Sequence, residues 1–196
     1  MKKSWDRNSR LIHWALSVTV VFQQVSSIWM SDPGTQYLFP YHRIIGAIAA
    51  AVVLFFWLYS YAIYDFKILF PWGRESRREV FNELRRLFQR RLPASGRRIG
   101  LSSFVHGLGI LALTGCALTG VVMFAMIPPG HIGPPEDPIA FTRYTLQHKF
   151  FGEMLWLYIC GHVIFAVIHQ LVGDNVFGAI FSLKREKDET PQKKQE

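Results

Sequence analysis

The sequence predicts an all-α membrane protein, a four-helix bundle with a cytoplasmic amphipathic interfacial helix between the second and third spans. Three observations predict this fold class: an apolar composition, four long apolar segments and a one-sided distribution of basic residues. Half of the 196 residues are apolar or aromatic and only 18% are charged, compared with roughly 25% in a typical soluble domain. This balance excludes a disordered, collagen-like or coiled-coil chain.

Four apolar segments approach the length of about 20 residues that a bilayer requires. They cover residues 11–30, 41–64, 104–127 and 150–172. A soluble bundle would place polar residues at every third or fourth position, whereas these segments are apolar nearly all round. The first segment is longer than the 7–15 residues of a signal-peptide core and no Ala-x-Ala site follows it. We therefore predict four transmembrane helices, the first of them uncleaved.

The basic residues lie mainly on one side of these spans. The N-terminus, the loop 65–100 and the C-terminal tail hold 4, 10 and 5 Lys or Arg, which is 19 of 22. The positive-inside rule then places both termini in the cytoplasm. We therefore attribute the formal net charge of +8 to the orientation of the protein in the membrane. We expect no nucleic-acid partner.

The connecting segments differ in character. The outer loop 128–147 is rich in Pro and Gly, so we expect little regular structure there. Residues 75–92 of the inner loop have apolar side chains at helical spacing among basic ones, which predicts an amphipathic helix on the anionic inner leaflet. The alternative is a merely solvated helix. The charged tail 184–196 is predicted to be disordered, which leaves residues 1–183 as one transmembrane domain.

Histidine is costly inside a membrane, so its positions indicate function. On a helical wheel the three histidines of the fourth span point to one side, and His148 and His162 are roughly 21 Å apart along the axis. The histidines at span ends are His13 (inner), His42 (outer), His106 (inner), His148 (outer), His162 and His169, whereas His131 lies in the outer loop.

Depth along the spans predicts two histidine pairs. His42 and His148 are both at outer ends, and the inner His13 requires either His162 or His169 as its partner. Two histidines on facing helices can hold a porphyrin iron from both sides, whereas a structural zinc ion would need four ligands close together. The pattern therefore favours haem. A transporter or channel with a histidine proton relay is the alternative.

Residues near the proposed ligands extend this interpretation. Small residues follow the four candidates by four positions, which leaves room for a porphyrin, although small residues also occur at ordinary helix contacts. They are Ser17, Gly46, Gly152 and Ala166. Arg43 and Lys149 directly follow His42 and His148. They are candidates for contacts with haem propionates or for attracting a small anion, and the alternative is a snorkelling charge at the interface.

The remaining polar residues are weaker candidates. His106 is a candidate contact for a quinone or a haem edge, with a plain interfacial histidine as the alternative, and His131 is interpreted as a loop residue. Cys116 and Cys160 are too few for a disulfide framework and are interpreted as small core residues. Glu153, inside the fourth span, is a candidate for a hydrogen bond or a proton path.

Several of these residues resemble a known family. The run Arg10-Leu-Ile-His13-Trp14, the spacing His148-x13-His162-x6-His169 and the following Gly173-Asp174-Asn175 resemble bacterial cytochrome b561. This family consists of four-helix, di-haem b membrane cytochromes related to the cytochrome b subunits of nickel-iron hydrogenases. The resemblance implies His13 and His162 as ligands of an inner haem and His42 and His148 as ligands of an outer one. His169 remains the runner-up ligand.

The resemblance also implies an activity. Such a protein would be an electron-transfer oxidoreductase of the bacterial inner membrane, working between the quinone pool and a redox partner at the outer face. One such reaction is superoxide oxidation with ubiquinone reduction. The alternative is a haem b membrane anchor subunit of a larger dehydrogenase or hydrogenase. The expected partners are the lipid bilayer, a quinone, an outer-face electron donor or acceptor and, for an anchor, a partner subunit.

Overall fold

The chain folds almost entirely into helices. A computed structural model describes residues 6–30, 33–63, 66–93, 99–127 and 135–181. These residues form helices and no β strand, so the predicted all-α class is confirmed. In chain order the helices are α1 (Arg7–Trp29), the 3₁₀ helix η1 (Pro33–Leu38), α2 (Phe39–Ala62), α3 (Phe66–Leu69), α4 (Arg74–Phe88), α5 (Leu101–Met126), α6 (Pro138–Leu171) and α7 (Val176–Phe181).

Four helices are long and apolar enough to cross a membrane, which confirms the four predicted spans. They are α1, α2 together with part of η1, α5 and α6. Large apolar side chains on their outer surfaces are exposed, for example Leu54 (61%), Leu118 (65%) and Leu157 (71%). Such a surface is unsuited to water and matches the hydrocarbon interior of a bilayer. The chain is therefore a multi-pass membrane protein.

The four spans meet around a small apolar core. Val20, Val53, Leu113 and Leu155, one from each span, form its buried centre. A β-carbon at Gly109 would lie 2.6 Å from the ring of Tyr158 on α6. Small residues at such positions let membrane helices approach closely. Glycine is therefore required where α5 and α6 pack against each other.

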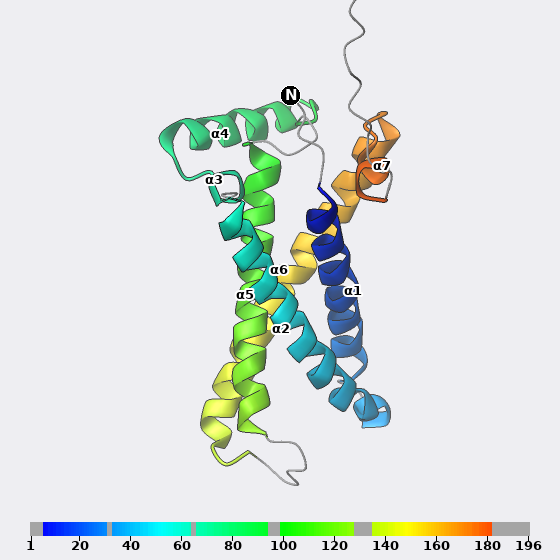
Figure 1. The fold of residues 1–196 in the computed structure, drawn as a ribbon, viewed down its shortest axis with the longest axis vertical. Coiled ribbons are helices and arrows are strands. Elements are labelled where there is room, and N and C mark those ends of the chain that lie inside the picture. The colour runs from blue at the N-terminus through cyan, green and yellow to red at the C-terminus, as the bar shows by residue number, and fades with distance from the viewer. Residues whose placement is uncertain (1–5, 31–32, 64–65, 94–98, 128–134, 182–196) are drawn as a thin grey trace, which may run out of the picture.

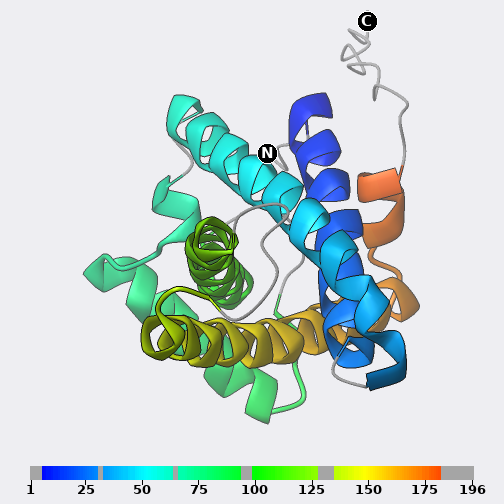
Figure 2. The same cartoon turned by 90° about the horizontal axis from the view of Figure 1, so that it is seen from below.

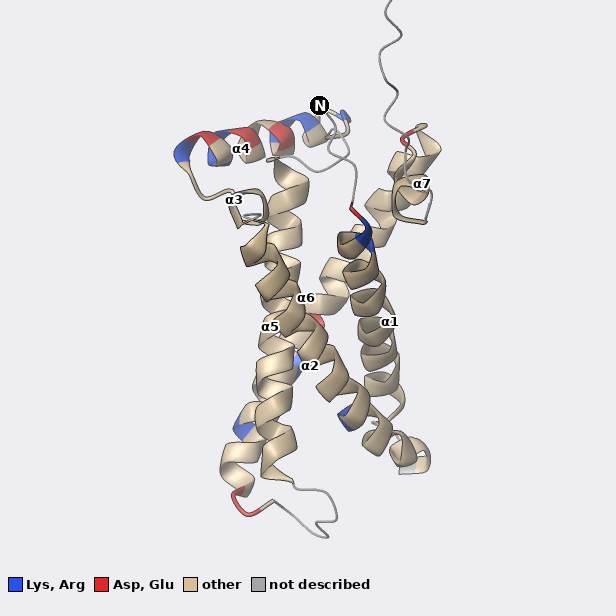
Figure 3. Cartoon of the chain, viewed as in Figure 1, with Lys and Arg blue, Asp and Glu red and all other residues tan. Residues whose placement is uncertain are grey.

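The two ends of the bundle differ in composition. Figures 1 and 2 show the start of α1, α4 and α7 at one end, with η1 and the start of α6 at the other. Charged residues gather on α4 and at the start of α1, whereas the long helices have few along their length (Figure 3). The end that bears α4 is called the basic end below, and the opposite one the far end.

Helix α4 confirms the predicted amphipathic helix and ends earlier than expected. It stops at Phe88, before Leu92, because Arg90 adopts φ +60°. The Arg90 N–H donates to Leu87 O and the Arg91 N–H to Arg86 O, both at 2.9 Å. This pattern is a Schellman motif, which closes a helix. Helix α4 lies across the basic end of α5 (Figure 1).

The start of α6 corrects one expectation. Residues 138–147 were expected to have little regular structure, but they are the first turns of α6. Asp137 caps this helix by accepting a hydrogen bond from Ala140 N–H at 2.9 Å, and Pro138 follows at the first helical position. Both are typical helix-start signals. With 34 residues, α6 is about 51 Å long, and it crosses the bundle obliquely (Figure 2). Residues 128–134, the rest of the expected loop, lie outside the described residues.

The C-terminal region adds one element that the sequence did not predict. The short helix α7 follows a turn at Gly173, whose φ is +95°. Its Phe181 contacts Trp14 of α1 edge to face, with ring centroids 4.7 Å apart. The predicted disordered tail 184–196 and the domain boundary before it lie outside the described residues.

Candidate functional site: two histidine pairs

The far end of the bundle brings His42 and His148 together. His42 lies in the first turn of α2, and His148 lies on α6 about three turns from its start. Their ring centroids are 6.4 Å apart and their planes are nearly perpendicular, at 85°. The predicted outer pair is thus formed by side chains from two facing helices.

Two hydroxyl groups orient these rings. Ser26 Oγ and Thr119 Oγ1 lie 2.9 Å from the Nδ1 atoms of His42 and His148, respectively. Each hydroxyl donates its own hydrogen to a backbone carbonyl, that of Gln23 for Ser26 and that of Gly115 for Thr119. With its hydrogen directed to a carbonyl, each hydroxyl oxygen can accept from an Nδ1–H of the neighbouring ring. A neutral imidazole with hydrogen on Nδ1 keeps its Nε2 lone pair for a ligand bond.

The basic end brings His13 and His162 together. His13 lies in the second turn of α1 and His162 on α6, with ring centroids also 6.4 Å apart and planes at 48°. Tyr158 stacks on His162 at 5.5 Å, and His106 of α5 meets it edge to face at 4.9 Å. Aromatic rings therefore lie beside the basic-end pair, whereas hydroxyl groups contact the rings of the far-end pair.

The separation within each pair suits a single metal ion between the two rings. A bond from a metal ion to an imidazole nitrogen is about 2 Å long, so two imidazoles on opposite sides of one metal have ring centroids roughly 6 Å apart. Both pairs match this value at 6.4 Å. Among the described residues, no group of three or more His, Cys, Asp or Glu side chains is arranged to hold a metal ion. Each site can therefore supply two axial protein ligands and leave the positions between them to a porphyrin.

The other histidines take different places. His169, the runner-up ligand, lies near the end of α6, where its Nδ1 is 2.9 Å from Asp174 Oδ2. His162 is the α6 histidine that lies against His13. His106 is at the basic-end pair, and its Nδ1 lies 2.6 Å from Ser102 O. His131 lies outside the described residues.

Arg43 and Lys149, which directly follow His42 and His148, differ in their contacts. The guanidinium of Arg43 donates to the carbonyl oxygens of Phe124 and Ile127 at the end of α5, where cations are favoured by the helix dipole. The guanidinium carbon Cζ of Arg43 also lies 4.8 Å from the ring centroid of Phe124. Lys149 is exposed, as is Glu153. Arg43 thus joins α2 to α5.

The glycines near the ligands also divide into two kinds. A β-carbon at Gly46 would collide with the side-chain amide nitrogen of Gln23, which donates to His42 O at 3.0 Å. Gly46 therefore makes room for Gln23. At Gly152 a β-carbon would meet no atom within 4 Å, so open space adjoins α6 one turn beyond His148, as a porphyrin would require.

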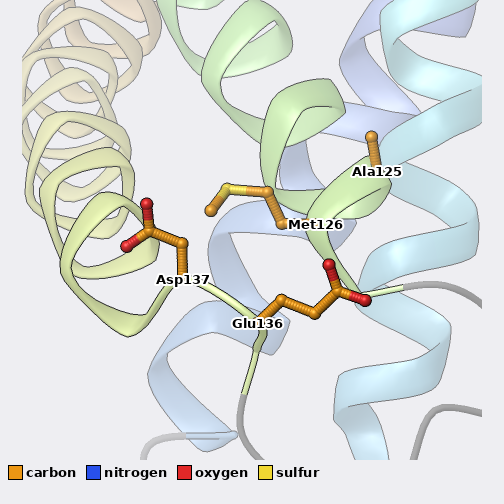
Figure 4. A pocket seen from close by; sticks show the side chains of 4 residues that line it. All are labelled: Ala125, Met126, Glu136 and Asp137. Carbon is orange, nitrogen blue, oxygen red and sulfur yellow. The ribbon is translucent and has the colours of Figure 1, made fainter.

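The sequence analysis missed Ser26, Thr119 and Tyr158. Each lies near a histidine only through contacts between helices, so spacing within one helix does not point to them. A polar residue inside an apolar span is the signal that selects Ser26 and Thr119 for inspection. A surface pocket lined by Ala125, Met126, Glu136 and Asp137 (Figure 4) contains none of these residues and no histidine.

The comparisons with known proteins agree with this geometry. The family model described as prokaryotic cytochrome b561 matches residues 4–182. No curated protein and no solved structure matches the chain. The family match covers the four spans and all six histidines of the bundle. The chain thus belongs to the prokaryotic cytochrome b561 family, whose members are membrane electron-transfer proteins that bind haem b.

Proposed function

We propose that the chain binds two haems b, one between His42 and His148 and one between His13 and His162. It then transfers electrons across the membrane between a quinone and a redox partner at the far end. The observation that supports this most directly is the repetition of one geometry, two facing imidazoles with centroids 6.4 Å apart, at both ends of the bundle. The hydroxyl contacts at the Nδ1 atoms of His42 and His148 support it further, because they leave the Nε2 atoms for a ligand bond.

The chain's own residues determine how such sites would work. Haem b supplies reversible one-electron transfer at its iron. His42 and His148 would hold one haem and His13 and His162 the other, and with two histidine ligands for each iron oxygen binding at the metal would not be expected. His148 and His162 are 14 residues apart on α6 and so about 21 Å apart along its axis, which places one site toward each surface. The proposed orientation has the basic end in the cytoplasm, because most of the described Lys and Arg residues lie there.

Haem counting tests this proposal. We expect a pyridine haemochrome assay on the purified chain to give two haems b per chain. His42→Ala and His13→Ala should each give one, because each removes one axial ligand of one site. His131→Ala, which changes a histidine that is assigned to neither pair, is the matched control and should retain two. Two haems in His42→Ala would refute the far-end pairing, and a colourless wild-type protein would refute haem binding altogether.

The finer proposal concerns the substrates. The family resemblance implies ubiquinone as electron acceptor and superoxide as one electron donor at the outer face. Two superoxide ions each lose one electron and leave as O₂, and the two electrons with two protons convert ubiquinone to ubiquinol. Arg43 and Lys149 near the far-end pair would attract such an anion.

Reconstitution tests the substrates. In nanodiscs that contain ubiquinone, a superoxide-generating system should reduce the haems and form ubiquinol, and superoxide dismutase should abolish both effects. Haem reduction that is unaffected by dismutase would exclude superoxide as donor. Co-purification of a stoichiometric dehydrogenase or hydrogenase subunit would instead identify the chain as a membrane anchor.

A further inference from the structure

We propose that Ser26 and Thr119 are positioning residues that set the reduction potential of the far-end haem. Each hydroxyl would accept the Nδ1–H of one of the two histidines that would hold the haem, fix the orientation of its ring and make the imidazole a stronger electron donor. The inference rests on the proposed function, because it concerns the same site. It goes further by assigning roles to two residues that are not ligands.

The direction of each hydrogen bond follows from where the hydroxyl hydrogen goes. Thr119 Oγ1 lies 2.7 Å from Gly115 O and 3.1 Å from Cys116 O, so its hydrogen is directed to these carbonyls of its own helix. Only its oxygen lone pairs are then available to His148 Nδ1 at 2.9 Å. Ser26 repeats this arrangement, with Gln23 O at 3.2 Å and His42 Nδ1 at 2.9 Å.

Both hydroxyls are buried and come from helices that hold no ligand of this pair. Ser26 is 3% exposed and Thr119 is 7% exposed. Ser26 lies on α1 and Thr119 on α5, whereas the ligands lie on α2 and α6. All four spans therefore contribute to the far-end site. In an apolar bundle, such a fixed acceptor determines both the tautomer and the orientation of the ring.

The electrostatic consequence has a definite sign. An acceptor on Nδ1–H increases negative charge on the imidazole and raises its basicity as a ligand. A more basic axial ligand stabilises the ferric state more than the ferrous state. The two hydroxyls therefore lower the reduction potential of this haem, and their removal raises it.

Potentiometric titration of full-length variants tests the proposal. Ser26→Ala and Thr119→Val each remove one hydroxyl, and Thr119→Ser keeps it. Thr19→Val is the matched control, because the Thr19 hydroxyl bonds only to carbonyls of α1. We expect two haems per chain in all variants. The midpoint potential of one haem should rise in Ser26→Ala and Thr119→Val, with wild-type values in Thr119→Ser and Thr19→Val.

The remaining outcomes are decisive as well. Loss of one haem in Thr119→Val with retention in Thr119→Ser would support the positioning role, since the two variants differ in the hydroxyl. Unchanged potentials with two haems present, or equal effects of the Val and Ser variants, would overturn it. Absence of haem from the wild-type protein would instead overturn the proposed function.

The exposed apolar edge of α4 supports a second, independent proposal. We propose that Phe81, Leu84 and Phe88 insert into the interfacial region of an anionic leaflet at the basic end. These side chains are 68%, 36% and 85% exposed. At 100° per residue they fall within an arc of about 60°, so they form one continuous edge. Aromatic and apolar side chains in this arrangement are typical of interfacial helices.

A buried carboxylate fixes which way this edge faces. Glu83 is 1% exposed, and its Oε2 accepts from Leu101 N–H at 2.7 Å at the start of α5. A carboxylate at a helix N-terminus satisfies free N–H groups and the helix dipole. The apolar edge is about 100–160° away from Glu83 around α4. It is therefore turned away from the bundle contact.

The net positive charge of α4 indicates that anionic lipid contacts its apolar edge. Residues 74–91 contain seven Arg and three Glu, a net positive segment that lies at the end of a transmembrane helix. Basic residues beside an apolar edge attract anionic lipid headgroups, and arginine can place its aliphatic stem in the interface with its charge at the phosphates.

Spin labelling of the haem-loaded chain in nanodiscs tests this surface. A nitroxide is attached to Phe88→Cys, or to Asn82→Cys on the polar face, in a background with Cys116→Ala and Cys160→Ala. In discs containing phosphatidylglycerol, the label at 88 should collide with lipid-soluble oxygen and be protected from a water-soluble nickel chelate. The label at 82 should show the reverse. Equal access of nickel to both labels would overturn the proposal.

Discussion

The two histidine pairs have the same separation but different surroundings. At the far end, hydroxyls from α1 and α5 hold both Nδ1 atoms. At the basic end, Tyr158 stacks on His162 and His106 meets its edge. Equal separation indicates the same ligation, whereas unequal surroundings indicate different electronics, since groups beyond the ligands tune a metal. In the proposed function, the chain would therefore distinguish its two haem sites with residues that are not ligands.

The largest expected effect separates the two candidate ligands at the basic end. His162→Ala should reduce the haem content from two to one per chain, because His162 lies against His13. His169→Ala should retain two haems, since His169 bonds to Asp174 beyond the pair. Haem quantitation with protein concentration measures both. One haem in His169→Ala and two in His162→Ala would reverse the assignment.

Space at the far end gives the next prediction. Gly152→Phe should lower haem content toward one per chain, because a β-carbon at this position adjoins open space beside His148 and the added ring would fill that space. The effect arises only if a porphyrin occupies that space. Val163→Phe, at an exposed α6 position, is the control and should retain two haems. Monodisperse Gly152→Phe protein with two haems would contradict the placement.

Packing at the basic end gives a smaller effect. In Gly109→Ala the new β-carbon would lie 2.6 Å from the Tyr158 ring, so Tyr158 must move against His162. Overpacking of this kind typically costs about 1–3 kcal/mol. We expect a lower thermal midpoint and a changed spectrum of one haem. Gly161→Ala, where a β-carbon meets open space, should leave both unchanged. Equal shifts in the two variants would contradict this interpretation.

Part of the fold and part of the candidate site could be predicted from the sequence. The four spans and the amphipathic helix follow from apolar length and periodicity, and depth alone pairs His42 with His148. Spacing left His162 and His169 as alternatives for His13, because both lie on one face of the same helix. The contact with His13 distinguishes them in space. Ser26, Thr119 and Tyr158 depend on contacts between helices, and no pattern within one helix encodes them. The first turns of α6 were predictable from Asp137-Pro138, but the Pro-rich composition before them obscured that signal.

The smallest effect concerns two of the hydrogen bonds that join the α1 region to α2. At the far end Ser26 contacts His42, and this link is buried and has no acidic group. At the basic end Tyr59 donates to Asp6 at 2.7 Å, and Asp6 also caps α1 by accepting from Ser9. Partial burial raises the pKa of Asp6, but hydrogen bonds from Ser9 and Tyr59 outweigh it and lower the pKa to about 2.

The basic-end bond should therefore depend on pH. Because the folded pKa of Asp6 lies below the unfolded value of about 3.9, its stabilisation is fully present above about pH 4 and is lost as the pH falls to about 2. Asp6→Ala should cost about 1 kcal/mol at pH 7, as for other N-caps, and Tyr59→Phe should cost less because the cap remains. Thermal midpoints in detergent measure both. The Asp6→Ala deficit should shrink between pH 4 and pH 2.5, and a deficit that stays constant over this range would contradict the proposed role of the Asp6 carboxylate.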